Sequence, residues 1–179
     1  MRKTALTILH EDDAIVVLDK PSGLPCIPER HGEATTVLHA LKAMIEQPPG
    51  RLLRVVHRLD RDTSGVMLVA RTADAQRGLT AQFMARTIVK TYLAIVRGRP
   101  AEPAGRVDAP IGQKRGSLVS VCINPKRSRP AVTDWEVIEA FVGYTLVRCR
   151  PLTGRQHQIR VHMQVAGLPL AVDELYGGG

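Results

Sequence analysis

The sequence predicts an α+β fold with a mixed, largely antiparallel central sheet and flanking helices. Several β-branched runs follow one another along the chain, and few helical stretches separate them, which is typical of this class. The chain has 179 residues, of which 44% are hydrophobic and 23% charged, so it is long enough and apolar enough to bury a core. We therefore expect a single domain over residues 1–179.

The first half of the chain predicts two strands and two helices. A β-branched run and a continuous apolar run indicate the strands, and the turn residues Pro21 and Gly23 end the first of them. Apolar residues at helical spacing indicate the helices, which Thr35 or Thr36 and then Thr72 can cap. The expected elements are a strand at 14–18, a helix at 35–46, a strand at 66–70 and a helix at 73–86.

The second half predicts more strands and one helix. A stretch rich in Pro, Gly and basic residues at 99–118 is expected to be an irregular loop. A helical pattern follows Gly154 and runs to about Ala166, with Gly167 in place to end the helix. The expected strands lie at 91–96, 118–123, 131–138 and 144–150.

The composition excludes several classes of protein. No apolar run approaches the ~20 residues that a membrane-spanning helix needs, and the N-terminus lacks the apolar core of a signal peptide. Three cysteines are too few and too scattered for a disulfide framework or a zinc ligand set. A reducing cytoplasm is the simplest compartment, and a monomer is the default state.

The positive charge is concentrated in the second half of the chain. The formal net charge is +8, and residues 86–160 alone hold 14 Lys and Arg against 5 Asp and Glu. This stretch is either a solvated basic face that only keeps the protein soluble or a surface that binds the phosphates of a nucleic acid. Only six aromatic residues are present, which argues against a stacking platform for single strands.

The most unusual stretch is the polar segment 56–65, which leads directly into an expected apolar strand. Five of its ten residues are ionisable. One interpretation is a charged surface turn, in which Asp60 and Asp62 pair with the neighbouring arginines. The alternative is a functional site, because loops on a rigid scaffold are where sites are usually placed.

A second polar segment, residues 153–162, contains His157 and His162. These histidines are five residues apart, whereas a zinc-binding pair on a helix needs a spacing of four, and no nearby carboxylate completes a site. We therefore expect no metal. Helix capping and hydrogen bonding in the core are the alternative roles for these histidines.

Both segments belong to an ordered set of motifs. The first reads His57-Arg-Leu-Asp-Arg-Asp-Thr-Ser-Gly65 and the second Gly154-Arg-Gln-His-Gln-Ile-Arg-Val-His162. The others are Asp19-Lys-Pro-Ser-Gly-Leu24, Lys90-Thr-Tyr-Leu-Ala-Ile-Val-Arg-Gly98, Pro130-Ala-Val-Thr133, and Gly167-Leu-Pro-Leu170 with Leu175-Tyr-Gly177. In this order, over residues 14–177, the set resembles the RluA-type family of RNA pseudouridine synthases.

The resemblance implies that the chain converts uridine to pseudouridine in RNA, without a cofactor or a metal. By position, Asp60 is the catalytic carboxylate, Tyr92 lies beside the uracil ring, and Arg160 pairs with Asp60. Arg58 helps to displace the target nucleotide from its stack. Further polar residues of the two motifs are expected to bind RNA: His57, Arg155, His157 and Gln158.

The residue types fit this chemistry. The glycosidic bond must break, the uracil must turn, and C5 must join C1′. A carboxylate serves either as the nucleophile at C1′ or as a base at the sugar, and the sequence leaves both routes open. A nearby Arg favours the ionised carboxylate that both routes need. Asp62 is the runner-up acid and is expected to cap the turn at Thr63-Ser64 instead.

Two other functions remain as alternatives, and the chain departs from the family pattern in two places. The alternatives are a catalytically silent RNA-binding module on the same fold and a nucleoside hydrolase, which would need a second carboxylate. Ribosomal and transfer RNA are both open as substrates. Val172-Asp173 stands where the family often has Gly-Asp, and relatives usually continue beyond Gly177-Gly-Gly179. We expect a fragment or a natural short form, with no separate N-terminal RNA-binding domain before residue 14.

Overall fold

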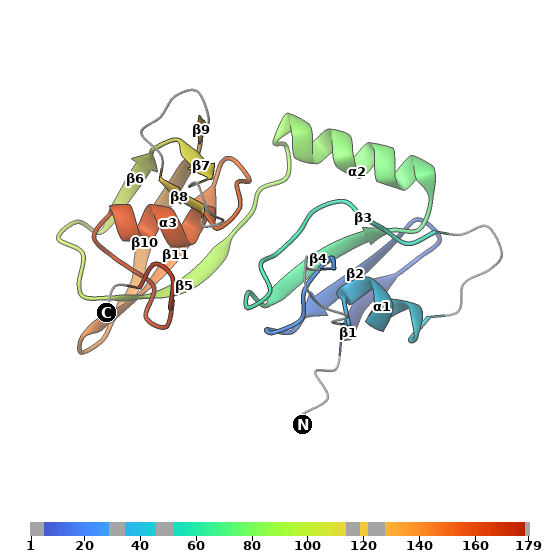
Figure 1. The fold of residues 1–179 in the computed structure, drawn as a ribbon, viewed down its shortest axis with the longest axis horizontal. Coiled ribbons are helices and arrows are strands. Elements are labelled where there is room, and N and C mark those ends of the chain that lie inside the picture. Colours follow the sequence, from blue (N-terminus) through green and yellow to red (C-terminus); the bar gives the residue numbers. More distant parts are fainter. Residues whose placement is uncertain (1–5, 29–34, 46–51, 114–118, 122–127, 178–179) are drawn as a thin grey trace. The chain divides into compact units, whose positions relative to one another are not determined.

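Figure 1 shows the fold in a computed structural model of the chain. The structure describes residues 6–28, 35–45, 52–113, 119–121 and 128–177. The chain forms two compact units, Met1–Thr87 and Ile88–Gly179, which we call the N-terminal and C-terminal units. Cys122, part of the basic stretch and the predicted end of the first helix lie outside the described residues.

The N-terminal unit is built on a four-stranded antiparallel sheet in the order β1-β2-β4-β3. On the central strands, Val16 and Leu18 of β2 are in register with Val69 and Met67 of β4, and all four side chains are fully buried. Successive side chains of a strand point to opposite faces of the sheet, so these four alternating residues form one apolar face. The strands are β1 (Thr7–Glu11), β2 (Ile15–Lys20), β3 (Arg54–Val55) and β4 (Gly65–Ala70).

Both predicted helices of the N-terminal unit are present, each with a threonine cap. Helix α1 (Val37–Lys42) begins where the Thr36 hydroxyl accepts a hydrogen bond from the His39 amide at 3.3 Å. Helix α2 (Ala73–Ala85) begins in the same way, with Thr72 accepting from the Ala75 amide at 3.1 Å. Side-chain acceptors satisfy amides that the first helical turn leaves without partners, which is why threonine marks these starts.

The C-terminal unit contains a second antiparallel sheet in the order β5-β11-β10-β6 and a smaller one in the order β8-β7-β9. Val147 and Cys149 of β11 are buried with Met163 of α3, while Arg148 and Arg150 alternate with them. Cys149 therefore faces the core, opposite to the two arginines. The elements are β5 (Tyr92–Arg97), β6 (Ala104–Asp108), β7 (Ile111–Gln113), β8 (Val119–Val121), β9 (Ser128–Arg129), β10 (Val132–Ala140), β11 (Tyr144–Pro151) and α3 (Gln158–Val165).

Helix α3 ends in a glycine cap, as the sequence predicts. Gly167 has a φ of 74°, its amide donates to the Gln164 carbonyl at 3.0 Å, and the Leu168 amide donates to the Met163 carbonyl at 2.8 Å. These two bonds form a Schellman motif, and the left-handed backbone explains why glycine stands there. Leu168 and Met163 belong to the same buried cluster.

The α+β class with antiparallel pairing is confirmed, but the irregular loop expected at 99–118 is wrong for its described part. Strands β6 and β7 lie there. β6 is an edge strand, where glycine is tolerated. Gly105 pairs with Trp135, and a Cβ on Gly105 would lie 2.6 Å from the indole ring. The short strands β1, β3 and β9 were not expected either.

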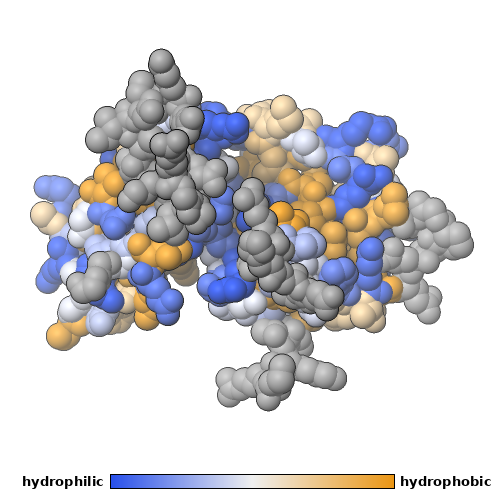
Figure 2. All heavy atoms as spheres, viewed as in Figure 1, coloured by the Kyte–Doolittle hydropathy of each residue, from blue (hydrophilic) through white to orange (hydrophobic). Residues whose placement is uncertain are grey.

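The surface of each unit mixes hydrophilic and hydrophobic residues in the view of Figure 2. Within the described part of the chain, no helix has the length and apolar character needed to cross a membrane. Over the same residues, no three His, Cys, Asp or Glu side chains gather as a metal site would require.

Candidate functional site

Asp60 lies in a tight turn between β3 and β4 of the N-terminal unit. The Thr63 amide donates to the Asp60 carbonyl at 3.1 Å and closes the turn, residues 60–63, which we call the Asp60 turn. Leu59, just before it, is buried, whereas Asp60 is half-buried and Arg58 is exposed. The buried leucine anchors the loop, and the polar residues beside it stay accessible.

The segment after β2, residues 20–26, holds the Asp60 turn through backbone groups. The Gly23 amide donates to the Arg61 carbonyl at 2.9 Å, and the Ser22 hydroxyl donates to the Asp62 carbonyl at 2.9 Å. Gly23 has a φ of 84°, a conformation that favours glycine. The motif at residues 19–24 therefore holds the motif at residues 57–65 in place.

Lys20 makes three hydrogen bonds in this segment, and the sequence did not predict this role. Its side chain is fully buried, and the ammonium donates to the carbonyls of Pro21 at 2.9 Å, Leu24 at 2.9 Å and Arg61 at 2.8 Å. Burial lowers the pKa of Lys20. Three carbonyl acceptors match the three donors of an ammonium group. Two signals in the sequence mark Lys20, its place at the end of an apolar strand and its membership of the motif at residues 19–24.

His57 has structural contacts in the same loop. Its Nε2 accepts a hydrogen bond from the Leu68 amide at 2.9 Å, and its ring stacks on Phe83 of α2 with centroids 4.7 Å apart. Because β3 ends at Val55, the imidazole supplies β4 with an acceptor after the strand pairing stops. The nearby Arg61 and Asp62 form an exposed ion pair at 3.4 Å.

In the C-terminal unit, Arg160 of α3 binds a carboxylate that the sequence did not indicate. Its Nε and Nη2 donate to the two carboxylate oxygens of Asp173 at 2.6 and 2.8 Å, and its guanidinium lies 5.0 Å from the centre of the Tyr176 ring. Burial acts to raise the pKa of Asp173, but hydrogen bonds from Arg160 and from the Tyr176 and Leu175 amides outweigh it and lower the pKa. Asp60 belongs to the N-terminal unit and Arg160 to the C-terminal unit, so the Asp60–Arg160 pairing stays a prediction.

Tyr92 and the late basic motif lie in the C-terminal unit. Tyr92 begins β5, in register with Cys149, and is half-buried against the core. His157 has a left-handed backbone, with a φ of 54°, and its Nδ1 lies 3.1 Å from the Tyr176 hydroxyl. Arg155 donates from Nε to the Pro130 carbonyl at 3.1 Å.

The structure favours a structural role for Gln158 over the RNA contact expected from the sequence. Its Nε2 donates to the Val132 carbonyl and the Thr133 hydroxyl, and its Oε1 accepts from the Thr153 hydroxyl and the Arg155 amide. The side chain is buried, so these bonds use the capacity of the amide inside the protein.

His162 is a core histidine, which was the alternative to a metal-binding role. Its Nε2 donates to the Ala109 carbonyl at 3.0 Å, which leaves Nδ1 to accept from the Thr133 hydroxyl at 2.9 Å. Burial lowers the pKa of His162 and keeps the ring neutral. The side chain is fully buried.

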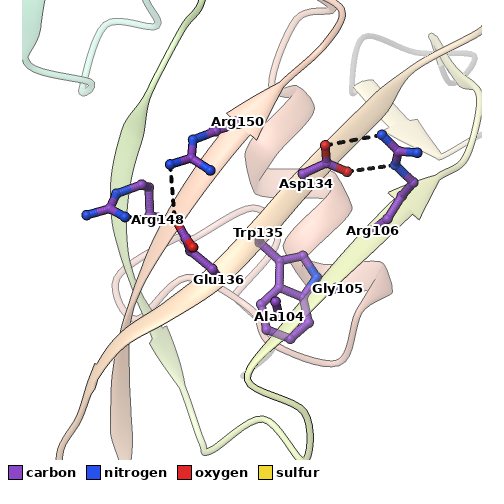
Figure 3. Close-up of a pocket in the computed structure, with 8 residues that line it drawn as sticks. All are labelled: Ala104, Gly105, Arg106, Asp134, Trp135, Glu136, Arg148 and Arg150. Carbon is purple, nitrogen blue, oxygen red and sulfur yellow. Dashed lines mark hydrogen bonds and ion pairs between the residues drawn. The ribbon is translucent and has the colours of Figure 1, made fainter.

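Strands β6, β10 and β11 carry a basic hollow of about 450 Å³ (Figure 3). Arg106 forms two hydrogen bonds with Asp134, at 2.7 and 3.2 Å. Arg148 and Arg150 share one carboxylate, Glu136, at 2.7 and 3.1 Å, and the bond from Arg148 lowers the pKa of Glu136. The hollow therefore holds three guanidiniums against two carboxylates.

Comparison with known proteins matches this chain to one family. A family model described as RNA pseudouridylate synthase matches residues 14–165. The chain is 43% identical over 170 residues to ribosomal large subunit pseudouridine synthase C of Vibrio vulnificus, and 45% identical over 174 residues to the protein of that name in Escherichia coli strain K12. Each match covers 95% of this chain but 52% and 53% of the relative, so the chain spans about half the length of these curated relatives.

Solved structures give the same result. Human RNA pseudouridylate synthase domain containing 4 superposes with a TM-score of 0.79 at 31% identity, over 95% of this chain and 68% of that chain. Human RNA pseudouridylate synthase domain containing 1 gives a TM-score of 0.81 at 27% identity, over 98% and 71%. Together with the motifs and the Asp60 turn, these matches establish that the chain belongs to the RNA pseudouridylate synthase family.

Proposed function

We propose that this chain isomerises uridine to pseudouridine in RNA, with Asp60 as the catalytic carboxylate. The observation that carries the proposal is the Asp60 turn, which holds the family's aspartate at the edge of a buried core. A half-buried carboxylate on a fixed backbone suits a reaction in which the attacking group must be held in position.

The reaction rearranges bonds within one nucleotide. The bond between C1′ and N1 breaks, the uracil turns, a bond forms between C1′ and C5, C5 loses its proton and N1 gains one. Asp60 either attacks C1′ and is later displaced by C5, or removes a proton from the sugar as the C1′–N1 bond breaks and returns it when the C1′–C5 bond forms. Both routes balance without an oxidant, a reductant or a metal.

The other site residues complete the proposal. Arg160, oriented by Asp173, pairs with Asp60 and stabilises its charge. Tyr92 contacts the uracil ring, to which its aromatic face is suited. Arg58 displaces the target nucleotide, and its exposure beside the buried Leu59 supports that role.

The substrate class is structured RNA. The basic residues of the C-terminal unit supply affinity through phosphates and do not select a base. Both bacterial relatives are named for the large ribosomal subunit, so ribosomal RNA of that subunit is the first substrate to test, with transfer RNA second.

The test uses RNA labelled with tritium at uridine C5, because this hydrogen is released when C5 bonds to C1′. Wild-type protein should release tritium, and Asp60→Asn and Asp60→Ala should reduce release by at least about 1,000-fold while still binding RNA. Asp62→Asn is the matched control and should keep most activity. Substantial turnover by folded Asp60→Ala would reject the assignment, and RNA binding without turnover by the wild type would favour the silent module.

A further inference from the structure

We propose that Cys26 is a positioning residue for Asp60, an inference that rests on the proposed function. Cys26 lies at the end of the 20–26 segment, outside the motifs that indicated the family. Its side chain is 3% exposed, and it contacts the residue directly before the catalytic aspartate.

The thiol of Cys26 meets both backbone groups of Leu59. The Leu59 amide donates to Cys26 Sγ at 3.4 Å, and Sγ lies 3.2 Å from the Leu59 carbonyl, to which it donates its hydrogen. A thiol is a weak donor and a weak acceptor, but contacts with the peptide groups on both sides of Leu59 fix the direction of the backbone there as well as its place. The Met67 sulfur lies 3.6 Å from Cys26 Sγ.

The residue after Asp60 is held by the same segment. The Lys20 ammonium and the Gly23 amide both donate to the Arg61 carbonyl, at 2.8 and 2.9 Å. Asp60 therefore stands between two residues that are each bonded to residues 20–26. Within this arrangement, Cys26 holds the backbone of Leu59, the residue directly before Asp60.

The segment that carries Cys26 is itself anchored. The Pro25 carbonyl accepts the Val37 amide, the first of α1, at 2.9 Å. Lys20, at the other end, follows Val16 and Leu18 on the buried face of β2. Because both ends are fixed, a change at Cys26 shifts Leu59 and the Asp60 turn more readily than it shifts the segment.

The size of the effect follows from the geometry that catalysis needs. A misplacement of about 1 Å in a reacting group can cost roughly 100-fold in rate. Removing the thiol contacts leaves the Lys20 contact in place, so we expect a smaller loss of about 10-fold. Binding of RNA does not depend on this position, so the loss should be in kcat and KM should stay within about 2-fold.

Two substitutions separate positioning from simple filling of the core. Cys26→Val keeps an apolar side chain of similar size but removes both hydrogen bonds, whereas Cys26→Ser keeps a donor and an acceptor in a smaller side chain. If Cys26 positions Leu59, kcat falls by about 10-fold in Cys26→Val and stays within about 3-fold in Cys26→Ser. If Cys26 only fills space, Cys26→Val keeps full kcat.

The experiment measures kcat and KM by tritium release for both variants, together with amide hydrogen exchange at Leu59. Cys26→Val should expose the Leu59 amide to faster exchange. Val16→Ala is the control, because it thins the same core at a position paired with Val69 and should lower stability without changing kcat.

Each outcome decides the inference. Lower kcat and faster Leu59 exchange in Cys26→Val, with Cys26→Ser close to wild type, supports it. An unchanged kcat in Cys26→Val, or an unchanged exchange rate, overturns it. Inactive wild-type protein on every RNA tested would reject the proposed function itself, and the exchange rate would then still show whether Cys26 holds Leu59.

Discussion

The two polar motifs of this chain look alike in sequence but are stabilised in opposite ways. In the N-terminal unit, residues 20–26 bond to the backbone of the Asp60 turn, and the polar side chains of Arg58, Arg61 and Asp62 stay exposed. In the C-terminal unit, Gln158 and His162 are buried and bonded to other groups. A dense polar motif can thus present side chains to a substrate or satisfy them inside the protein.

The largest expected effect is on stability and concerns the Arg160–Asp173 pair, whose carboxylate is almost fully shielded from solvent. Asp173→Ala removes two hydrogen bonds from Arg160 and the acceptor of the Leu175 and Tyr176 amides, and breaking a buried pair costs about 3–5 kcal/mol. Asp134→Ala is the matched control, because its pair with Arg106 also has two hydrogen bonds but both side chains are at least 39% exposed, against 22% and 4% in the Arg160 pair. We expect a cost of at most about 1 kcal/mol for the control. Equal losses in urea denaturation would show that burial does not separate the two pairs.

The next largest effect is expected on stability and comes from the buried Lys20 of the N-terminal unit. Lys20→Met removes the donor to the carbonyls of Pro21 and Leu24, and unsatisfied buried groups cost about 1–3 kcal/mol each. Relief of the buried charge offsets part of this, so we expect a loss of about 2 kcal/mol in the free energy of unfolding. Arg61 still has the Gly23 amide as a donor. Stability equal to wild type would mean that the buried ammonium contributes no more than an apolar side chain.

Features that depend on neighbouring residues could be predicted from the sequence, whereas contacts between distant residues could not. Local patterns correctly predicted the central strands of both units, the caps at Thr36 and Thr72, and the end of α3 at Gly167, because those features depend on residues close in the chain. The partner of Arg160 and the anchor of Leu59 lie 13 and 33 residues away. Nothing in residue spacing encodes such contacts, which arise only when strands and helices pack.

The same limit explains the strands missed at 99–118 and the role given to Gln158. Proline and glycine usually mark loops, but β6 is an edge strand whose Gly105 makes room for Trp135. Gln158 is expected to bind RNA as a residue of the late basic motif, whereas the structure buries its side chain. Both differences come from tertiary packing that overrides a local signal.

A smaller effect is expected from the buried histidine. Burial lowers the pKa of His162 in the folded state, whereas the unfolded chain keeps an ordinary value of about 6.5. Below that pH the unfolded state binds the proton first, so the free energy of unfolding falls, by at most about 1.4 kcal/mol per pH unit. His162→Gln should flatten this dependence between pH 6.5 and 5, while the exposed His39→Gln should keep it. An identical slope in His162→Gln would place the proton uptake elsewhere.

The smallest expected effect is on RNA affinity and follows from how the arginines of the hollow are paired. Among the residues that the structure describes, Asp134 pairs with Arg106 alone, so that pair is close to neutral, whereas Arg148 and Arg150 share Glu136 and keep one excess positive charge. Counterions leave RNA when a Lys or Arg neutralises a phosphate, and an arginine already neutralised by its own carboxylate does this less readily. Arg150→Gln should therefore weaken RNA binding a few-fold and reduce the slope of log K against log salt by about 1, while Arg106→Gln should change both less. Fluorescence anisotropy at several salt concentrations measures both quantities, and an equal change in the two variants would mean that the shared carboxylate does not govern which arginine meets the phosphates.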